Sequence, residues 1–205
     1  EPFVHLVRDP LEVCASSYLY ALKSSEGWLR VPHNSLNEES LQSYYRRVSK
    51  SEGLAFECRR ALKEMRHMVS VYTLSARRQL TLTVHFEELS GSHFDRAMRR
   101  LLGFIGVAQG TNDSREELRT AELVRAISKH DLSRHTPKAH EAAHMSDQDS
   151  KQSLRALLLD PSLGLAEDIQ KLRLHLDYPT SNSSAQMYVD EVLSQKWHRA
   201  TLAQN

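Results

Sequence analysis

The residues with the clearest chemical potential lie near the start of the 205-residue chain. Arg8 directly follows the apolar run Phe3–Val7, which is typical of a parallel strand covered on both faces. Asp9 and Pro10 come next and are typical of a helix N-terminus, and Ser16 falls on the polar side of that helix. Open α/β sheets bind ligands at the carboxyl ends of their strands, and helix N-termini attract anions. The pattern therefore predicts a phosphate site at which Arg8 and Ser16 converge.

Simpler interpretations apply to the same two residues. In one, Arg8 only neutralises a nearby acid such as Glu12, and in the other Ser16 is an ordinary exposed helix serine. Local sequence alone leaves these alternatives open. A second motif, later in the chain, favours the phosphate site.

That second motif is a strand followed by a helix. Leu80–Phe86 alternates and is rich in β-branched residues. The motif itself is Leu82–Leu89, and the amphipathic segment after it ends in Leu101–Val107. Together with Arg8-Asp9-Pro10 and a serine eight residues after Arg8, this segment resembles two motifs of the sulfotransferases that use 3′-phosphoadenosine 5′-phosphosulfate. The resemblance covers most of the chain, and both specific motifs lie in its first half.

The resemblance implies a fold and a set of binding residues. The fold is a partial P-loop-like α/β fold, with few parallel strands, crossover helices and a helical C-terminal half. Residues 1–178 would be the C-terminal part of a sulfotransferase domain, and 179–205 a C-terminal tail helix. Arg8 and Ser16 would hold the 3′-phosphate of the cofactor, and Phe86 would lie against its adenine. The alternative for Phe86 is a core aromatic at a strand end.

The family's further 3′-phosphate contacts, an Arg-Lys-Gly triplet, have no counterpart here, and Arg134 or Lys138 is the expected substitute. The loop for the 5′-phosphosulfate is missing too, since none of the seven glycines follows a strand in a suitable context. The resemblance therefore implies that this loop and the catalytic base lie upstream of Glu1. Catalytic residues stay unassigned, and the chain alone is expected to transfer no sulfate.

The implied reaction transfers a sulfuryl group to a hydroxyl, for example of a carbohydrate, or to an amine acceptor, without a metal. Two other classes of protein stay open. A P-loop kinase of nucleotides or small molecules would require a Gly-x-x-x-x-Gly-Lys-Ser/Thr loop upstream of this chain. In a non-catalytic helical interaction module, Arg8 and Ser16 would be incidental.

Other polar residues favour structural roles. His5 lies in the apolar run and is expected to be a hydrogen-bonded core histidine rather than a base. Glu87 and Glu88 are expected to form ion pairs with Arg96, Arg99 or Arg100. Four histidines in a polar stretch are expected to be solvated rather than to bind a metal, since no Cys or paired acid completes a ligand set: His130, His135, His140 and His144.

Hydrophobic periodicity and turn residues predict the remaining elements. The first half reads as strand, helix, helix, strand and helix, which is typical of a parallel sheet with crossover helices. The second half reads as helical. Beyond the first strand, the predicted elements are a helix from Pro10, helices over 41–49 and 54–74, a strand over 80–86, a helix after Gly91 that ends at Gly106, and helices over 115–129, 150–159, 165–176 and 185–200.

Composition restricts the partners. Lys plus Arg (27) nearly balances Asp plus Glu (26), and the arginine pairs are dispersed, so the pattern does not indicate a nucleic-acid-binding protein. No apolar run reaches the length of a membrane span, and no membrane contact is expected from this segment. Cys14 and Cys58 fall on apolar helix faces and are expected to be buried thiols, with a disulfide as the alternative. Two Asn-x-Ser sequons would suit a secretory protein but also arise by chance, so the compartment stays open between cytoplasm and Golgi lumen. The oligomeric state is open as well.

Overall fold

The chain folds into a mixed α/β structure that is mostly helical. The computed structural model describes residues 3–75, 81–89, 91–106, 114–131, 133 and 148–179. The helices and strands of this part are β1 (Phe3–Val7), α1 (Pro10–Lys23), α2 (Leu41–Arg47), α3 (Lys50–Ser75), β2 (Thr81–His85), α4 (Phe94–Phe104), α5 (Ser114–Ile127), α7 (Gln148–Leu158) and α8 (Ala166–His175).

The sheet of the described residues consists of β1 and β2, which run parallel. The register pairs Phe3 with Thr81 and Val7 with His85, so both strands end side by side at the same edge. A parallel pair requires a long crossover, and α1, α2 and α3 supply it. The predicted parallel strands with helical crossover are therefore confirmed.

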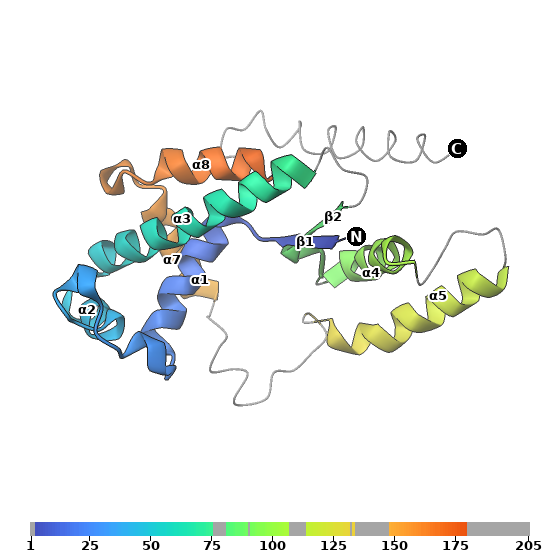
Figure 1. The fold of residues 1–205 in the computed structure, drawn as a ribbon, viewed down its shortest axis with the longest axis horizontal. Helices are drawn as coiled ribbons and strands as arrows, with labels where there is room; N and C mark the ends of the chain where they lie inside the picture. The colour runs from blue at the N-terminus through green and yellow to red at the C-terminus, as the bar shows by residue number, and fades with distance from the viewer. Residues whose placement is uncertain are drawn as a thin grey trace.

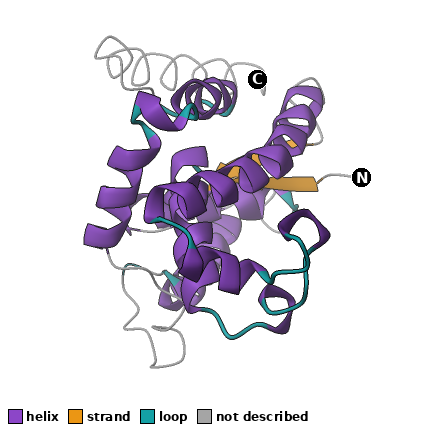
Figure 2. Cartoon of the chain, turned by 90° about the vertical axis from the view of Figure 1, so that its left-hand side faces the viewer, coloured by secondary structure: helices purple, strands orange, loops and turns teal. Residues whose placement is uncertain are grey.

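Helices lie on both sides of the strands (Figure 1). On one side α1 contacts α2, α3, α7 and α8, and α3 also contacts α8. On the other side α4 contacts β2 and α5. Figure 2 shows how small the sheet is beside the helices, as the two orange strands are short. The short sheet therefore lies between the two helical groups.

Helix α1 begins as its sequence predicts. Asp9 is the N-cap, its Oδ1 accepts the N–H of Leu11 at 2.9 Å, and Pro10 occupies the first turn. Glu12 stands at the position from which a capping box could form, but the Asp9 N–H donates to Glu87 instead. The carboxylate of Glu87, which follows the neighbouring strand β2, therefore takes the position that the nearby Glu12 could have filled.

The main hydrophobic core lies between α1, α3, α7 and α8. Helix α1 contributes Leu11, Cys14 and Tyr18, which are buried. Where α1 crosses α3, a Cβ on Gly53 would stand only 3.1 Å from the Tyr18 ring, so glycine permits the close approach. The helices of the second half close the core with fully buried side chains, which are Leu154, Leu158, Leu165 and Ile169.

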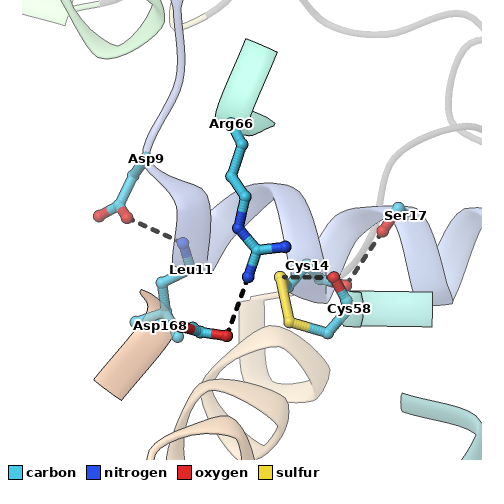
Figure 3. Close-up of a disulfide and its surroundings, with 7 residues drawn as sticks. All are labelled: Asp9, Leu11, Cys14, Ser17, Cys58, Arg66 and Asp168. Atoms are coloured by element: carbon cyan, nitrogen blue, oxygen red, sulfur yellow. Dashed lines mark hydrogen bonds and ion pairs between the residues drawn. A yellow bond between two sulfur atoms is a disulfide. The ribbon is translucent and has the colours of Figure 1, made fainter. Parts of the chain in front are cut away.

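The cysteines form a disulfide rather than the two free thiols that the sequence predicts. Cys14 on α1 and Cys58 on α3 are bonded to each other, with their Cα atoms 4.6 Å apart (Figure 3). Both residues are fully buried, so the apolar-face assignment was right. The interpretation as thiols was wrong because the tight crossing of α1 and α3 brings the two faces within bonding distance.

Strand β1 is covered on one face only, which corrects the expectation of a strand covered on both. On the covered face His5 and Val7 are buried and Phe3, at the start of the strand, is 43% exposed, whereas Val4 and Leu6 on the other face are 38% and 46% exposed. The physical reason is the position of α4, which packs on the neighbouring strand β2 and buries Val84 there. Within the described residues, the outer half of that sheet face stays open.

The other predicted helices agree with the structure to within a few residues. Helix α3 begins earlier than expected, at Lys50, and Gly106 follows α4 with a positive φ of 76°, which favours glycine. The second half is helical where it is described. The polar stretch 134–147 and the expected helix 185–200 lie outside the described residues, as does nearly all of the expected tail 179–205.

Candidate functional site

The candidate site lies at the carboxyl ends of the two parallel strands. Arg8 is the first residue after β1, and Phe86 is the first residue after β2. Since Val7 pairs with His85 in the register, the residues that follow them leave the sheet side by side. Helix α1 begins two residues after Arg8, and its second turn brings Ser16 back toward the strand ends.

Three of the predicted site residues meet there. Arg8 Nη2 donates a hydrogen bond to Ser16 Oγ at 3.3 Å. The Arg8 guanidinium carbon lies 4.8 Å from the centroid of the Phe86 ring, a cation–π arrangement. The fourth predicted residue, Arg134, and its alternative Lys138 lie outside the described residues. One guanidinium is thus oriented by a hydroxyl from α1 and an aromatic ring from the end of β2.

Arg8 does not neutralise Glu12. That carboxylate forms an ion pair with Arg155 of α7 instead. No carboxylate of the described residues pairs with Arg8, and its buried Nε has no hydrogen-bond partner there. A partly buried guanidinium with unused donors is an unfavourable state for a protein group, and an anionic ligand would relieve it.

Phe86 has a contact that the sequence did not predict. It is half-buried and has the Arg8 guanidinium over its ring. This contact limits the rotamers of Arg8 and thereby prepares its donor groups for a ligand. A role of Phe86 toward adenine stays a prediction.

The acids after β2 form two separate contacts. Glu88 accepts from Arg100 Nη1 at 2.6 Å, one of the pairings expected from sequence. Burial alone would raise the pKa of Glu88, but hydrogen bonds from His85 and the charge of Arg100 lower it to about 2. Glu87 accepts the hydroxyl of Tyr178 at 2.6 Å, a contact that the sequence did not predict.

Asp9, next to Arg8 in the chain, is paired with helix α8. Arg173 Nε lies 3.1 Å from Asp9 Oδ1, and both side chains are nearly buried. Burial raises the pKa of Asp9, and Arg173 is the largest influence in the opposite direction. Sequence reasoning missed Arg173 and Tyr178, since no local pattern marks a contact made across most of the chain.

His85 connects the same region to the end of α8. Its Nε2 lies 2.9 Å from the carbonyl oxygen of Leu176, and its ring meets Tyr178 edge-on at 4.9 Å. Burial lowers the pKa of His85, but hydrogen bonds to Glu88 and to that carbonyl outweigh it, so the net shift is upward. The histidine therefore acts as a donor between β2 and α8.

His5 is buried in the core, as expected. The expected hydrogen bond is not seen at its Nδ1, which has no partner within the described residues. Its ring lies 6.3 Å from that of Tyr72, and burial lowers its pKa. The described part of the chain contains no group of three or more His, Cys, Asp or Glu residues that could hold a metal. His135, His140 and His144 fall outside it.

Among the described helices, none combines the length and the apolar character needed to cross a bilayer. No protein-family model, no curated protein and no solved structure matches this chain.

Proposed function

We propose that the site at the strand ends binds the 3′-phosphate of 3′-phosphoadenosine 5′-phosphosulfate, in a P-loop-like sulfotransferase domain. The observation that carries this proposal is the state of Arg8. Ser16 and Phe86 orient its guanidinium, which has no carboxylate partner within the described residues. A guanidinium and a hydroxyl that converge in this way match the oxygens of a phosphate dianion.

The position in the fold supports the same ligand. Both strands of the parallel sheet end at the site, and the N-terminus of α1 faces it with its positive dipole end. The two sequence motifs that resemble the sulfotransferase family supply Arg8, Ser16 and Phe86, and these residues come together in space.

In the proposed reaction, an acceptor hydroxyl or amine attacks sulfur, the bond from sulfur to the phosphate bridge breaks, and a base takes the acceptor proton. Arg8 and Ser16 would hold the nucleotide in place for this step, which is a positioning contribution. The described residues offer no base for that proton next to Arg8, where each acid already has a partner. The catalytic groups of the proposed enzyme therefore stay unassigned.

Isothermal titration calorimetry with adenosine 3′,5′-bisphosphate tests the proposal. Arg8→Ala is expected to weaken binding by about 1.5–3 kcal/mol, the range for a hydrogen-bonded charged partner. Adenosine 5′-monophosphate, which lacks the 3′-phosphate, should bind the wild type and Arg8→Ala alike. Arg46→Ala is the matched control, because Arg46 is an exposed arginine on α2, away from the strand ends.

Equal bisphosphate affinity of the wild type and Arg8→Ala would overturn the assignment. A wild-type chain that binds neither nucleotide would favour the helical interaction module. A preference for ATP over the bisphosphate that is unaffected by Arg8→Ala would favour a kinase.

A further inference from the structure

Carboxylates surround the proposed anion site. Asp9 follows Arg8 in the chain, Glu87 follows Phe86, and Glu12 lies one helical turn before Ser16 on α1. Uncompensated carboxylates at these positions would repel a phosphate dianion and would also compete for Arg8. Anion binding is therefore favoured when other groups neutralise these acids or hold them in hydrogen bonds.

Each of these acids has its own partner from the C-terminal half. Glu12 pairs with Arg155 of α7. Asp9 pairs with Arg173 of α8 at 3.1 Å, and the two side chains are only 13% and 11% exposed. Glu87 accepts the hydroxyl proton of the buried Tyr178 at 2.6 Å.

The segment 173–178 also holds the backbone on both sides of the site residues. Before Arg8, Val7 packs against Leu176 and Tyr178. After Arg8, the Asp9 N–H donates at 3.3 Å to the same Glu87 carboxylate that Tyr178 contacts. Arg8 therefore projects from a segment that is held at both neighbouring residues.

Phe86 is held in the same way. His85, before it, donates to the carbonyl oxygen of Leu176, and Glu87, after it, accepts from Tyr178. The contacts made by residues 173–178 thus hold the backbone from which the side chains of Arg8 and Phe86 project. They also influence the net charge around these two side chains.

We propose that Arg173 and Tyr178 are positioning residues of the anion site: Arg173 neutralises Asp9, and the Tyr178 hydroxyl holds Glu87 in a hydrogen bond, so that Arg8 stays available to a phosphate dianion. This inference rests on the proposed function. It assigns the C-terminal helix, which contacts no ligand in this scheme, a direct influence on ligand affinity.

The test is a charge-compensation experiment, with adenosine 3′,5′-bisphosphate as the probe in calorimetry. Arg173→Gln leaves Asp9 uncompensated and is expected to weaken binding roughly tenfold. Arg173→Lys keeps the charge and should bind within about threefold of the wild type. The double variant Arg173→Gln/Asp9→Asn should recover most of the lost affinity, because Asn caps a helix as well as Asp does.

The hydroxyl of Tyr178 is tested in the same way. Tyr178→Phe should weaken binding of the bisphosphate, because the Glu87 carboxylate loses the hydrogen bond from Tyr178. Adding Glu87→Gln should restore the affinity, since this change removes the negative charge of Glu87. This pair of variants changes few atoms, so it carries the test if Arg173→Gln does not fold in circular dichroism. Arg66→Gln is the matched control, because Arg66 forms its exposed ion pair with Asp168 of α8 rather than with an acid beside Arg8, and should keep wild-type affinity (Figure 3).

The outcomes separate this inference from the proposed function. If the wild type fails to bind the bisphosphate, the proposed function falls and this inference falls with it. If Arg8→Ala weakens binding but Arg173→Gln and Tyr178→Phe bind like the wild type, only the positioning role is overturned. Double variants that stay as weak as the single ones also overturn it, because a purely structural role predicts no rescue by charge removal.

Discussion

At the residue scale, the site depends on which polar groups have partners inside the protein. Arg8 has a hydroxyl and a ring as neighbours but no carboxylate within the described residues, although acids lie close to it in sequence. Those acids are satisfied by Arg155, Arg173 and Tyr178. The allocation of partners, more than the presence of an arginine, distinguishes a binding site from an internal ion pair.

Ser16 provides the smallest test of the site. Ser16→Ala removes one hydroxyl contact and is expected to weaken bisphosphate binding by about 0.5–1.5 kcal/mol, with little change in melting temperature. Ser17→Ala on the same helix is the control, since the Ser17 hydroxyl donates to the carbonyl of Cys14 instead. Equal losses of affinity in both variants would contradict a specific role for Ser16.

A second residue-scale prediction concerns acid stability. The pKa of Glu88 is lowered from 4.5 to about 2 in the folded chain, so its stabilisation is present above about pH 4.5 and is lost as the pH falls toward 2. A shift of this size corresponds to roughly 3 kcal/mol at neutral pH. We expect Glu88→Gln to be less stable than the wild type at pH 7 and to approach it at pH 2.

Urea unfolding of the wild type and Glu88→Gln between pH 2 and pH 7 measures this difference. Glu64→Gln, at an exposed position on α3, is the control and should follow the wild type throughout. A constant gap between the wild type and Glu88→Gln over this range would show that ionisation of Glu88 does not stabilise the fold.

At the element scale, the crossing of α1 and α3 is the main organising contact. Gly53 allows the Tyr18 ring to approach, and Cys14 and Cys58 join the helices covalently. Helix α1 also carries Ser16 and begins beside Arg8. The crossing with α3 therefore fixes the position of the helix that orients Arg8. Structural disulfides are typical of proteins from oxidising compartments.

The disulfide closes a loop of 44 residues and is expected to stabilise the fold by about 3–4 kcal/mol. Urea unfolding with and without a reductant measures this contribution, and the Cys14→Ala/Cys58→Ala variant should be insensitive to the reductant. Thiol labelling under denaturing, non-reducing conditions provides the direct check. Two reactive thiols per chain in that assay would contradict the bond.

At the scale of the whole molecule, distant segments complete one core. Helices α7 and α8 pack on α1 and α3, and their leucines are as fully buried as those of the first half. The same helices supply Arg155 and Arg173, which neutralise acids near the site. Stability and the electrostatics of the site are therefore linked through α7 and α8.

Truncation of one core side chain tests this link. Leu158 of α7 is completely buried, and Leu158→Ala is expected to destabilise the fold by about 2–5 kcal/mol in urea unfolding. Leu118→Ala is the control, because Leu118 on α5 is 66% exposed and its truncation should change stability by less than about 0.5 kcal/mol. Similar, small losses in both variants would contradict the assignment of α7 to the core.

Much of this organisation could be predicted from local sequence. The strand Phe3–Val7, the cap at Asp9 and the helical faces depend on contacts between residues a few positions apart, and a periodic pattern records such contacts directly. The convergence of Arg8 and Ser16 belongs to this class, since a strand end and two turns of one helix determine it. Phe86 joined them because parallel pairing aligns the strand ends.

Only the tertiary structure decided the remaining contacts. The disulfide required the approach of two helix faces, and the Glu87–Tyr178 contact spans 91 positions. The partner of Glu12 proved to be Arg155 on a distant helix, not its neighbour Arg8. Such contacts depend on how the whole chain closes on itself, and the residue types alone allow several pairings of similar energy. The sequence therefore determined where Arg8 would stand, and the packing of α7 and α8 determined that the nearby acids would pair with other groups.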